Sequence, residues 1–265
     1  MVDYYTKHTS NIHRGDYDAA IKTNKLYDDT RSVVAKFINS DSDEVIFTSG
    51  TTMSINMVVF GYMEKVLNAG DEVLLTKSEH ASNVLPWIKL SEKKGIVIKY
   101  MDLDDDYSLS IQSVKKSVTD KTKVISIAHV TNVIGDVRDI ESIGRICREN
   151  NILFCVDGAQ SVPHMKVDFK NSNIDFLSFS GHKMCGPTGV GCLVVKKKYL
   201  DVMEPLCYGG GMNNYFEGDN SYELKKGVIK FEAGTPDYVG VMAMTEALNY
   251  VEEAKKAILA LKKQN

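Results

Sequence analysis

Polar side chains of the kinds that bind phosphates and move protons follow five apolar segments of this sequence. Each group comes directly after a short run rich in Val and Ile, where a strand would end. In chain order the groups are Gly50-Thr51-Thr52, Glu79-His80, His129 with Asn132, Asp157 with Gln160, and Ser180 with His182 and Lys183. Because ligands of open α/β sheets bind beyond the carboxyl ends of the strands, the five groups together predict one site.

Three of these groups have complementary chemistry. The Gly50-Thr51-Thr52 turn would offer hydroxyls and helix N-terminal N–H groups to a phosphate, although an ordinary helix cap has the same sequence. Asp157 follows an apolar strand and would need a partner such as a cationic ring nitrogen, unless it forms a local turn with Gly158. Lys183 is a surface lysine by default, but desolvation would make its amine a nucleophile. A phosphate cradle, a strand-end aspartate and a reactive lysine are together what pyridoxal 5′-phosphate requires.

Seven apolar segments predict the strands that must position this site. They cover residues 45–48, 73–76, 96–100, 124–128, 152–156, 174–179 and 191–195. Stretches of helical spacing lie between several of them, at 53–67, 85–94 and 140–149. This alternation predicts an α/β fold with a mainly parallel sheet. Only about ten residues separate the last two strands, too few for a crossover helix, so we expect that pair to be antiparallel.

The C-terminal third is less regular. Residues 208–227 are rich in Gly and Asn and predict a long surface loop. From Val239 the spacing becomes helical and continues to Asn265 without a Gly or Pro stop, so we expect the chain to be cut within a longer protein.

The composition excludes several classes of protein. With 265 residues, of which 43% are hydrophobic and 25% charged, the chain is neither disordered nor collagen-like. The 32 basic and 35 acidic residues are well mixed, which argues against nucleic-acid binding. No apolar run is long enough for a membrane span, and the first residues do not have the pattern of a signal peptide. Five cysteines without metal-like spacing (Cys147, Cys155, Cys185, Cys192 and Cys207) predict no metal site and a reducing, cytoplasmic location.

Seven segments of the sequence resemble the class V aminotransferase family and, within it, the group II (Suf-type) cysteine desulfurases. They are 11–15, 47–52, 79–87, 129–135, 156–160, 179–189 and 231–236, in the family's order and spacing. The resemblance implies the large domain of a type I pyridoxal-phosphate-dependent transferase. In that fold a mainly parallel seven-stranded sheet carries helices on both faces.

The resemblance also implies catalytic and ring-binding roles. Lys183 resembles the lysine that carries the cofactor and later moves the substrate Cα proton. His80 resembles the imidazole that stacks on the cofactor ring and shuttles protons. Asp157 would keep the pyridinium nitrogen charged, and Gln160 would donate to the phenolic oxygen. Asn132 would lie beside the cofactor and the substrate.

Further positions resemble the family's phosphate ligands. Thr52, Ser180 and His182 match residues that bind the phosphate, and Thr51 lies in the same turn. Thr235 matches a residue that reaches the phosphate of the partner subunit, so the resemblance implies a homodimer with shared active sites.

The implied activity converts L-cysteine, or a related amino acid, to L-alanine. Sulfur would pass to an enzyme cysteine and then to an acceptor protein, for iron–sulfur cluster assembly or another sulfur-transfer pathway. In the family, the persulfide-forming cysteine and a carboxylate-binding arginine lie in a C-terminal domain without a counterpart here, so we expect little such activity from this chain alone. Cys185 stands where relatives usually have an aromatic residue, and we expect it to be a simple replacement.

The resemblance divides the chain into three parts. Residues 1–40 would form an N-terminal segment and helix, 41–238 the cofactor-binding large domain, and 239–265 a helix that leads toward the absent domain. Two alternatives stay open. The chain could serve another class V reaction, as a selenocysteine lyase or a small-amino-acid aminotransferase, or it could be a non-catalytic truncated or split fragment.

Overall fold

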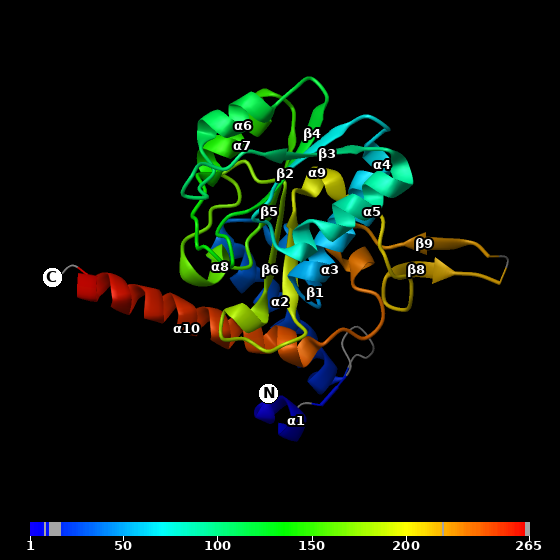
Figure 1. The fold of residues 1–265 in the computed structure, drawn as a ribbon. Helices are drawn as coiled ribbons and strands as arrows, with labels where there is room; N and C mark the ends of the chain where they lie inside the picture. Colours follow the sequence, from blue (N-terminus) through cyan, green and yellow to red (C-terminus); the bar gives the residue numbers. More distant parts are fainter. Residues whose placement is uncertain (8, 11–16, 219, 263–265) are drawn as a thin grey trace.

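A mixed sheet of seven strands forms the centre of the molecule (Figure 1). The structure is a computed structural model, which describes residues 1–7, 9–10, 17–218 and 220–262. The strand order across the sheet is β1-β7-β6-β5-β4-β2-β3. The strands are β1 (Val45–Thr48), β2 (Glu72–Thr76), β3 (Val97–Met101), β4 (Thr122–Ala128), β5 (Leu153–Asp157), β6 (Phe176–Ser180) and β7 (Gly191–Val195). All seven predicted strands are present, and the predicted α/β class is confirmed.

Only β7 runs against the other strands of this sheet. It pairs antiparallel with both β6 and β1, while the pairs from β6 through β5, β4 and β2 to β3 are parallel. The antiparallel arrangement expected for the last two strands is therefore confirmed. Since β1 thus runs in the same direction as the parallel strands, the ends of six strands meet at one edge of the sheet.

Helices cover both faces of the sheet, as expected for this fold (Figure 1). One face packs against residues of α2 (Asp18–Ile38), α6 (Ile111–Ser117), α7 (Ile140–Glu149), α8 (Ser161–His164) and α10 (Tyr238–Lys262). The other packs against residues of α3 (Thr51–Asn56), α5 (Leu85–Lys94) and α9 (Lys197–Leu200), and the short α4 (Glu64–Val66) lies on this side. Successive residues of a strand point to opposite faces, so Cys192 and Val194 belong to the first core and Leu193 and Val195 to the second.

Two segments differ from their predicted form. The helix expected over 53–67 begins at Thr51, and its middle part, Met57–Met63, is a π-helix. The expected surface loop contains an antiparallel hairpin of β8 (Asn213–Phe216) and β9 (Tyr222–Leu224), so that expectation was wrong for these residues. The aromatic residues of the two short strands favour pairing, which outweighed the surrounding glycines and asparagines.

The N-terminal part packs onto the C-terminal helix. After the short helix α1 (Val2–Lys7), α2 lies along α10, and the hydroxyls of Thr30 and Thr245 are 2.9 Å apart. The family-like motif at 11–15 lies outside the described residues.

A buried ion pair covers the open side of the edge strand β1. Arg31 and Glu232 form two parallel N–H···O bonds of 2.8 and 2.9 Å. Arg31 also donates to the carbonyl of Val45, and the Phe47 N–H donates to Glu232 at 2.9 Å. The two side chains thus bond backbone groups that a further strand would otherwise pair with.

At the carboxyl edge, the first residue of β7 lies unusually close to the turn after β1. A Cβ added to Gly191 would be 2.5 Å from Gly50 Cα and 2.6 Å from the Phe179 carbonyl oxygen. Gly50 has φ 141° and ψ 178°, a conformation open only to glycine among ordinary residues. The two glycines let α3 begin directly beside the ends of β6 and β7.

We expect Gly191→Ala to lower the free energy of unfolding by about 1–3 kcal/mol, because both clashing atoms belong to the backbone. Gly218→Ala is the matched control, since no heavy atom lies within 4 Å of its added Cβ. Chemical denaturation of the two variants measures the difference. Equal stability of both variants would show that the approach of Gly191 to Gly50 is not tight.

Candidate active site

The predicted site residues gather around one cavity at the carboxyl edge of the sheet. It has a volume of about 180 Å³. Nine of the predicted residues line it, namely Thr51, Thr52, His80, Asn132, Asp157, Gln160, Ser180, His182 and Lys183, whereas Gly50, Glu79, His129 and Thr235 do not. They come from the segments that follow β1, β2, β4, β5 and β6, so the expected convergence of five groups is what the structure has.

The strand order explains why the cavity lies here. From β2 the chain moves outward to β3, and from β4 it moves the other way, through β5 to β6. The segments after β2 and β4 therefore diverge, which leaves a crevice between them at the carboxyl edge. His80 follows β2 and Asn132 follows β4, so both stand beside this crevice.

Hydroxyl groups form a connected cluster on one side of the cavity. Ser180 Oγ accepts the N–H of Thr51 at 2.8 Å and lies 2.7 Å from the Thr51 hydroxyl. The hydroxyl of Thr52 lies 2.7 Å from that of Ser82. With the exposed His182 they form a set of donors at the start of a helix, which is the chemistry that an anion requires.

His80 is held in one orientation by its neighbour. Its Nδ1 accepts the backbone N–H of Ser82 at 3.1 Å, and the Ser82 hydroxyl is also 3.1 Å away. Because Nδ1 is an acceptor, a neutral His80 carries its proton on Nε2. Ser82 lines the cavity and links His80 to Thr52, yet it was not among the predicted site residues. Its position two residues after His80 was the signal that could have found it.

Asp157, at the end of the central strand β5, is the most unusual charge of the site. Its side chain is buried, and among the described residues its only hydrogen bond comes from the Ala159 N–H at 2.9 Å. The pKa of Asp157 is raised to about 6, mainly by burial and in smaller part by the charge of Glu79, while the Ala159 N–H, Lys183 and His80 act in the opposite direction. Asp157 is thus a buried anion with capacity for a cationic partner.

Lys183 lies in the turn after β6 and is half-buried at the cavity wall. Within the described part of the chain, its amine has neither a hydrogen bond nor an ion pair. A lysine that faces a cavity without a partner is available to an electrophilic ligand.

Other predicted or nearby residues lie outside the cavity. Thr235 is exposed in the turn before α10 and does not line it, so its role toward a second subunit stays a prediction. His129 is buried, which lowers its pKa to about 4, and it does not line the cavity either. Ala128, Val130 and Ala159 complete the wall and were not predicted, because apolar residues carry no chemical signal in the sequence.

The described residues contain neither a metal-binding cluster nor a membrane-spanning helix. No group of three or more His, Cys, Asp or Glu side chains is placed to hold a metal ion. No helix among these residues combines the length and the apolar character needed to cross a bilayer.

Comparison with known proteins agrees with this arrangement. The sequence profile of the Aminotransferase class-V family matches residues 1–265. The chain is 39% identical over 252 residues to a probable cysteine desulfurase of Halalkalibacterium halodurans, covering 95% of this chain and 62% of that protein. It is 40% identical over 255 residues to a probable cysteine desulfurase of Staphylococcus aureus, covering 95% and 61%. The chain therefore spans about three fifths of the length of these curated relatives.

Solved structures show the same fold. The apo structure of a cysteine desulfurase from Thermococcus onnurineus superposes with a TM-score of 0.91 at 34% identity, covering 95% of this chain and 62% of that one. A cysteine desulfurase from Escherichia coli superposes with a TM-score of 0.87 at 30% identity, covering 95% and 63%. The seven-stranded sheet is thus that of the type I fold, as predicted.

We expect Asp157→Asn to stabilise the ligand-free protein at neutral pH. The pKa of Asp157 is about 6 in the folded protein against an ordinary 3.8, so the folded state binds the proton more tightly. Unfolding free energy is therefore lost as pH rises from about 4 to 6, and the full loss of about 3 kcal/mol remains above that range. Asparagine carries no charge, so a gain of about 1–3 kcal/mol at neutral pH should vanish near pH 4.

Denaturant unfolding of both proteins at several pH values measures this difference. Asp120→Asn, at an exposed carboxylate, is the matched control and should change stability little at any pH. A variant at position 157 that is less stable than the parent at neutral pH would contradict the burial of an unpaired charge.

Proposed function

The chain belongs to the class-V aminotransferase family, and we propose that it forms the cofactor-binding part of a pyridoxal-phosphate-dependent cysteine desulfurase of the Suf type. The whole enzyme would convert L-cysteine to L-alanine and pass the sulfur atom to one of its own cysteines. One observation carries the proposal: a buried carboxylate and a lysine amine, both without an ionic partner among the described residues, line the same cavity as a cluster of hydroxyls. The names of the similar proteins support cysteine as the substrate.

Pyridoxal phosphate is the cofactor of this family, and the groups around the cavity fit it. Asp157 offers acceptor oxygens to a cationic ring nitrogen, because a single backbone N–H bonds it in the described part of the chain. Thr51, Thr52 and Ser180 offer hydroxyls to a phosphate. Lys183 offers an amine to an aldehyde. When bound, the cofactor supplies an electron-withdrawing ring for chemistry at the Cα of an amino acid.

The roles of the individual side chains follow from these positions. Lys183 would hold the cofactor and then move a proton at the substrate Cα, because no other group engages its amine in the described residues. His80 would face the ring and carry a proton at Nε2, since Nδ1 accepts from Ser82. Asp157 is ionised at neutral pH and would hold a proton on the ring nitrogen opposite it.

The remaining lining residues would orient the bound molecules. Gln160 and Asn132 have no hydrogen-bond partner among the described residues, which leaves their amides available. We assign Gln160 to the phenolic oxygen of the cofactor and Asn132 to the edge that faces the substrate. His182 would complete the phosphate site with Thr51, Thr52 and Ser180.

Neither exposed cysteine of this chain suits the sulfur-accepting role. Cys185 and Cys207 are exposed, but neither lines the cavity. We therefore assign that role to a cysteine of the whole enzyme outside this sequence, and we expect Cys185→Ser to leave cofactor binding unchanged.

We further propose a cytoplasmic homodimer that hands sulfur to an acceptor protein, for iron–sulfur cluster assembly or a similar pathway. All five cysteines are free thiols, which supports a reducing compartment. Thr235 is exposed and does not line its own cavity, which leaves its hydroxyl available to the phosphate of a second chain. The division into residues 1–40, 41–238 and 239–265 belongs to the same proposal, with the last part leading to the remaining domain of the enzyme.

The first experiment is the visible absorption spectrum of the purified protein with added pyridoxal phosphate, before and after borohydride. We expect a yellow species that borohydride fixes to the chain, because the Lys183 amine faces the cavity. Lys183→Ala should abolish the fixed species, and peptide mass spectrometry should find the label on Lys183 alone.

Lys121→Ala is the matched control, because this lysine is exposed at the opposite edge of the sheet and should leave the spectrum unchanged. A label on another lysine, or a spectrum of free cofactor only, would reject the proposed site. Product analysis of the whole enzyme with cysteine, with selenocysteine, and with alanine plus a keto acid then distinguishes the desulfurase from the other class V reactions.

A further inference from the structure

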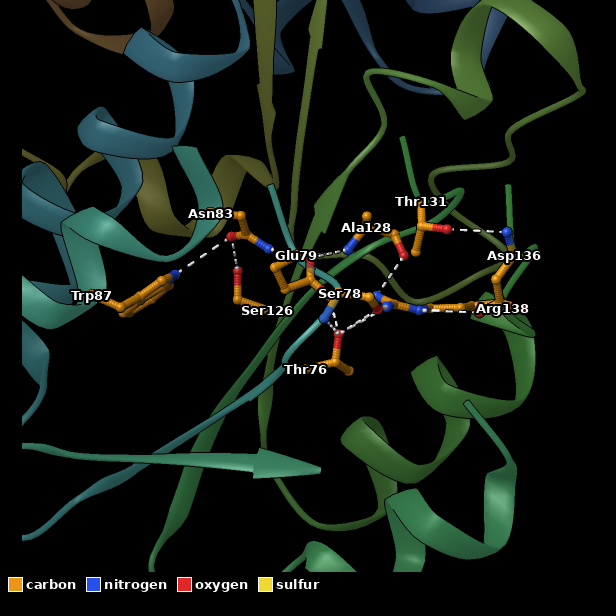
Figure 2. Close-up of polar contacts among 10 residues, drawn as sticks. All are labelled: Thr76, Ser78, Glu79, Asn83, Trp87, Ser126, Ala128, Thr131, Asp136 and Arg138. Carbon is orange, nitrogen blue, oxygen red and sulfur yellow. Dashed lines mark hydrogen bonds and ion pairs between the residues drawn. The ribbon is translucent and has the colours of Figure 1, made fainter. Parts of the chain in front are cut away.

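A second buried ion pair joins the segments that follow β2 and β4 (Figure 2). Glu79 follows β2, and Arg138 follows the loop after β4. Neither side chain has any solvent exposure, and Arg138 Nη1 donates directly to Glu79 Oε1. Burial of both charges costs desolvation energy, and hydrogen bonds offset that cost at every polar atom of the pair except Arg138 Nε, which has no hydrogen bond among the described residues.

The guanidinium of Arg138 reaches both sides of the crevice. Nη2 donates to the hydroxyls of Thr76 and Ser78, each at 2.8 Å, on the β2 side. Nη1 donates to the carbonyl of Ala128 at 3.1 Å, on the β4 side. Nε lies 3.6 Å from the carboxylate of Asp136, within the loop after β4.

The carboxylate of Glu79 also bonds groups of both segments. Its Oε2 accepts the Ala128 N–H at 2.7 Å and the Asn83 amide at 2.9 Å. Asn83 in turn accepts the hydroxyl of Ser126 at 2.6 Å, which adds a further bond between the two segments (Figure 2).

These bonds lie beyond the end of the backbone pairing between β2 and β4. The ladder between β2 and β4 stops at Leu74 and Ile125, and the strands separate beyond it. Ala128 is therefore without a neighbouring strand on the β2 side, and its N–H and carbonyl bond Glu79 and Arg138 instead. The ion pair therefore bonds both sides of the separation between β2 and β4.

The pair is also next to the groups assigned to the chemistry. Glu79 directly precedes His80, and Ala128 pairs in register with Asp157 across β4 and β5. The loop that carries Asn132 is closed by a bridge between Val130 and Val137, directly before Arg138. The Arg138 N–H donates to the His129 carbonyl at 3.0 Å, so the base of this loop is tied to the same arginine.

The charges of Glu79 and Arg138 also bear on the pKa of Asp157. Glu79 is the anion whose charge raises the pKa of Asp157, and Lys183 and His80 are the groups that lower it. Because the positive charge of Arg138 lies next to the carboxylate of Glu79, we expect it to cancel part of the field of Glu79 at Asp157.

We propose that Glu79 and Arg138 are positioning residues for this site, which set the distance of His80 and Asn132 from Asp157 and balance the charge around the Asp157 carboxylate. The inference rests on the proposed function for the roles of His80, Asn132 and Asp157. The geometry of the pair itself does not depend on it.

The test uses Glu79→Gln and Arg138→Met, because the two variants remove opposite charges. In the ligand-free protein, NMR titration of the Asp157 carboxyl should give a lower pKa in Glu79→Gln and a higher pKa in Arg138→Met. Arg138→Lys keeps the positive charge but loses the planar guanidinium that donates to both segments. It should therefore leave the pKa of Asp157 near the parent value. All three should weaken the binding of pyridoxal phosphate, followed by absorbance, by about tenfold or more.

Asp175→Asn is the matched control. Asp175 pairs with Lys196 at the opposite edge of the sheet, and its carboxylate accepts the Phe154 N–H. Its loss should lower stability without changing the Asp157 titration or the cofactor affinity. If a single variant of the pair fails to fold, the double variant Glu79→Gln/Arg138→Met removes both buried charges and takes its place. Its Asp157 pKa should lie between those of the single variants, and its cofactor affinity should still be reduced.

The outcomes separate the two proposals. An Asp157 titration that moves in the same direction in both single variants, or in none, overturns the charge role. Affinities equal to that of the parent overturn the positioning role. In either case cofactor bound to Lys183 in the parent would leave the proposed function intact. Absence of that adduct in the parent would reject the proposed function, while the titrations would still decide the charge role.

Discussion

A buried carboxylate without an ionic partner among the described residues is the constraint around which this structure is built. Asp157 ends the central strand of the sheet, where water cannot compensate its charge. Such a charge is unfavourable in the protein alone and becomes favourable when a cation lies opposite. The neighbouring strand ends bring a lysine, an imidazole and a set of hydroxyls to the same cavity. The charge of Asp157 therefore destabilises the protein without a ligand, and a cationic ligand opposite Asp157 would remove this destabilisation.

Two buried Arg–Glu pairs bond backbone groups of the sheet at places where a strand has no neighbour. Glu79 and Arg138 span the crevice between β2 and β4, and Arg31 and Glu232 cover the open side of β1. In both places a carboxylate accepts a backbone N–H and a guanidinium donates to a backbone carbonyl. The side chains therefore replace an adjacent strand where the sheet has none, and this keeps the polar backbone satisfied without closing the crevice.

Membership of the class-V aminotransferase family and the geometry of the cavity support the same chemistry. The family accounts for the fold and for the cofactor, and the cavity is lined by the carboxylate, the lysine amine and the hydroxyls on which the proposed binding of that cofactor rests. The chain spans about three fifths of its curated relatives, so the sulfur-transfer step belongs to the proposal for the whole enzyme. In the same proposal, this part of the protein binds and orients the cofactor, and Lys183 moves the proton at the substrate Cα.

Local patterns in the sequence determined the elements, and the tertiary structure decided how they meet. All seven strands, and the bounds of α5 and α7, followed from apolar periodicity and helix-ending signals, because these depend on residues close together in the chain. The convergence of the predicted polar residues followed too, since parallel strands share one carboxyl edge. The pairing of Glu79 with Arg138, the link from Ser82 to Thr52, the π-helical turn and the β8–β9 hairpin did not follow. The two side-chain contacts depend on which strands become neighbours, and that is decided by the burial of the whole core rather than by any local run of residues. The π-helix and the hairpin are local elements, but the hydrophobic spacing and the Gly and Asn content of their segments did not indicate them.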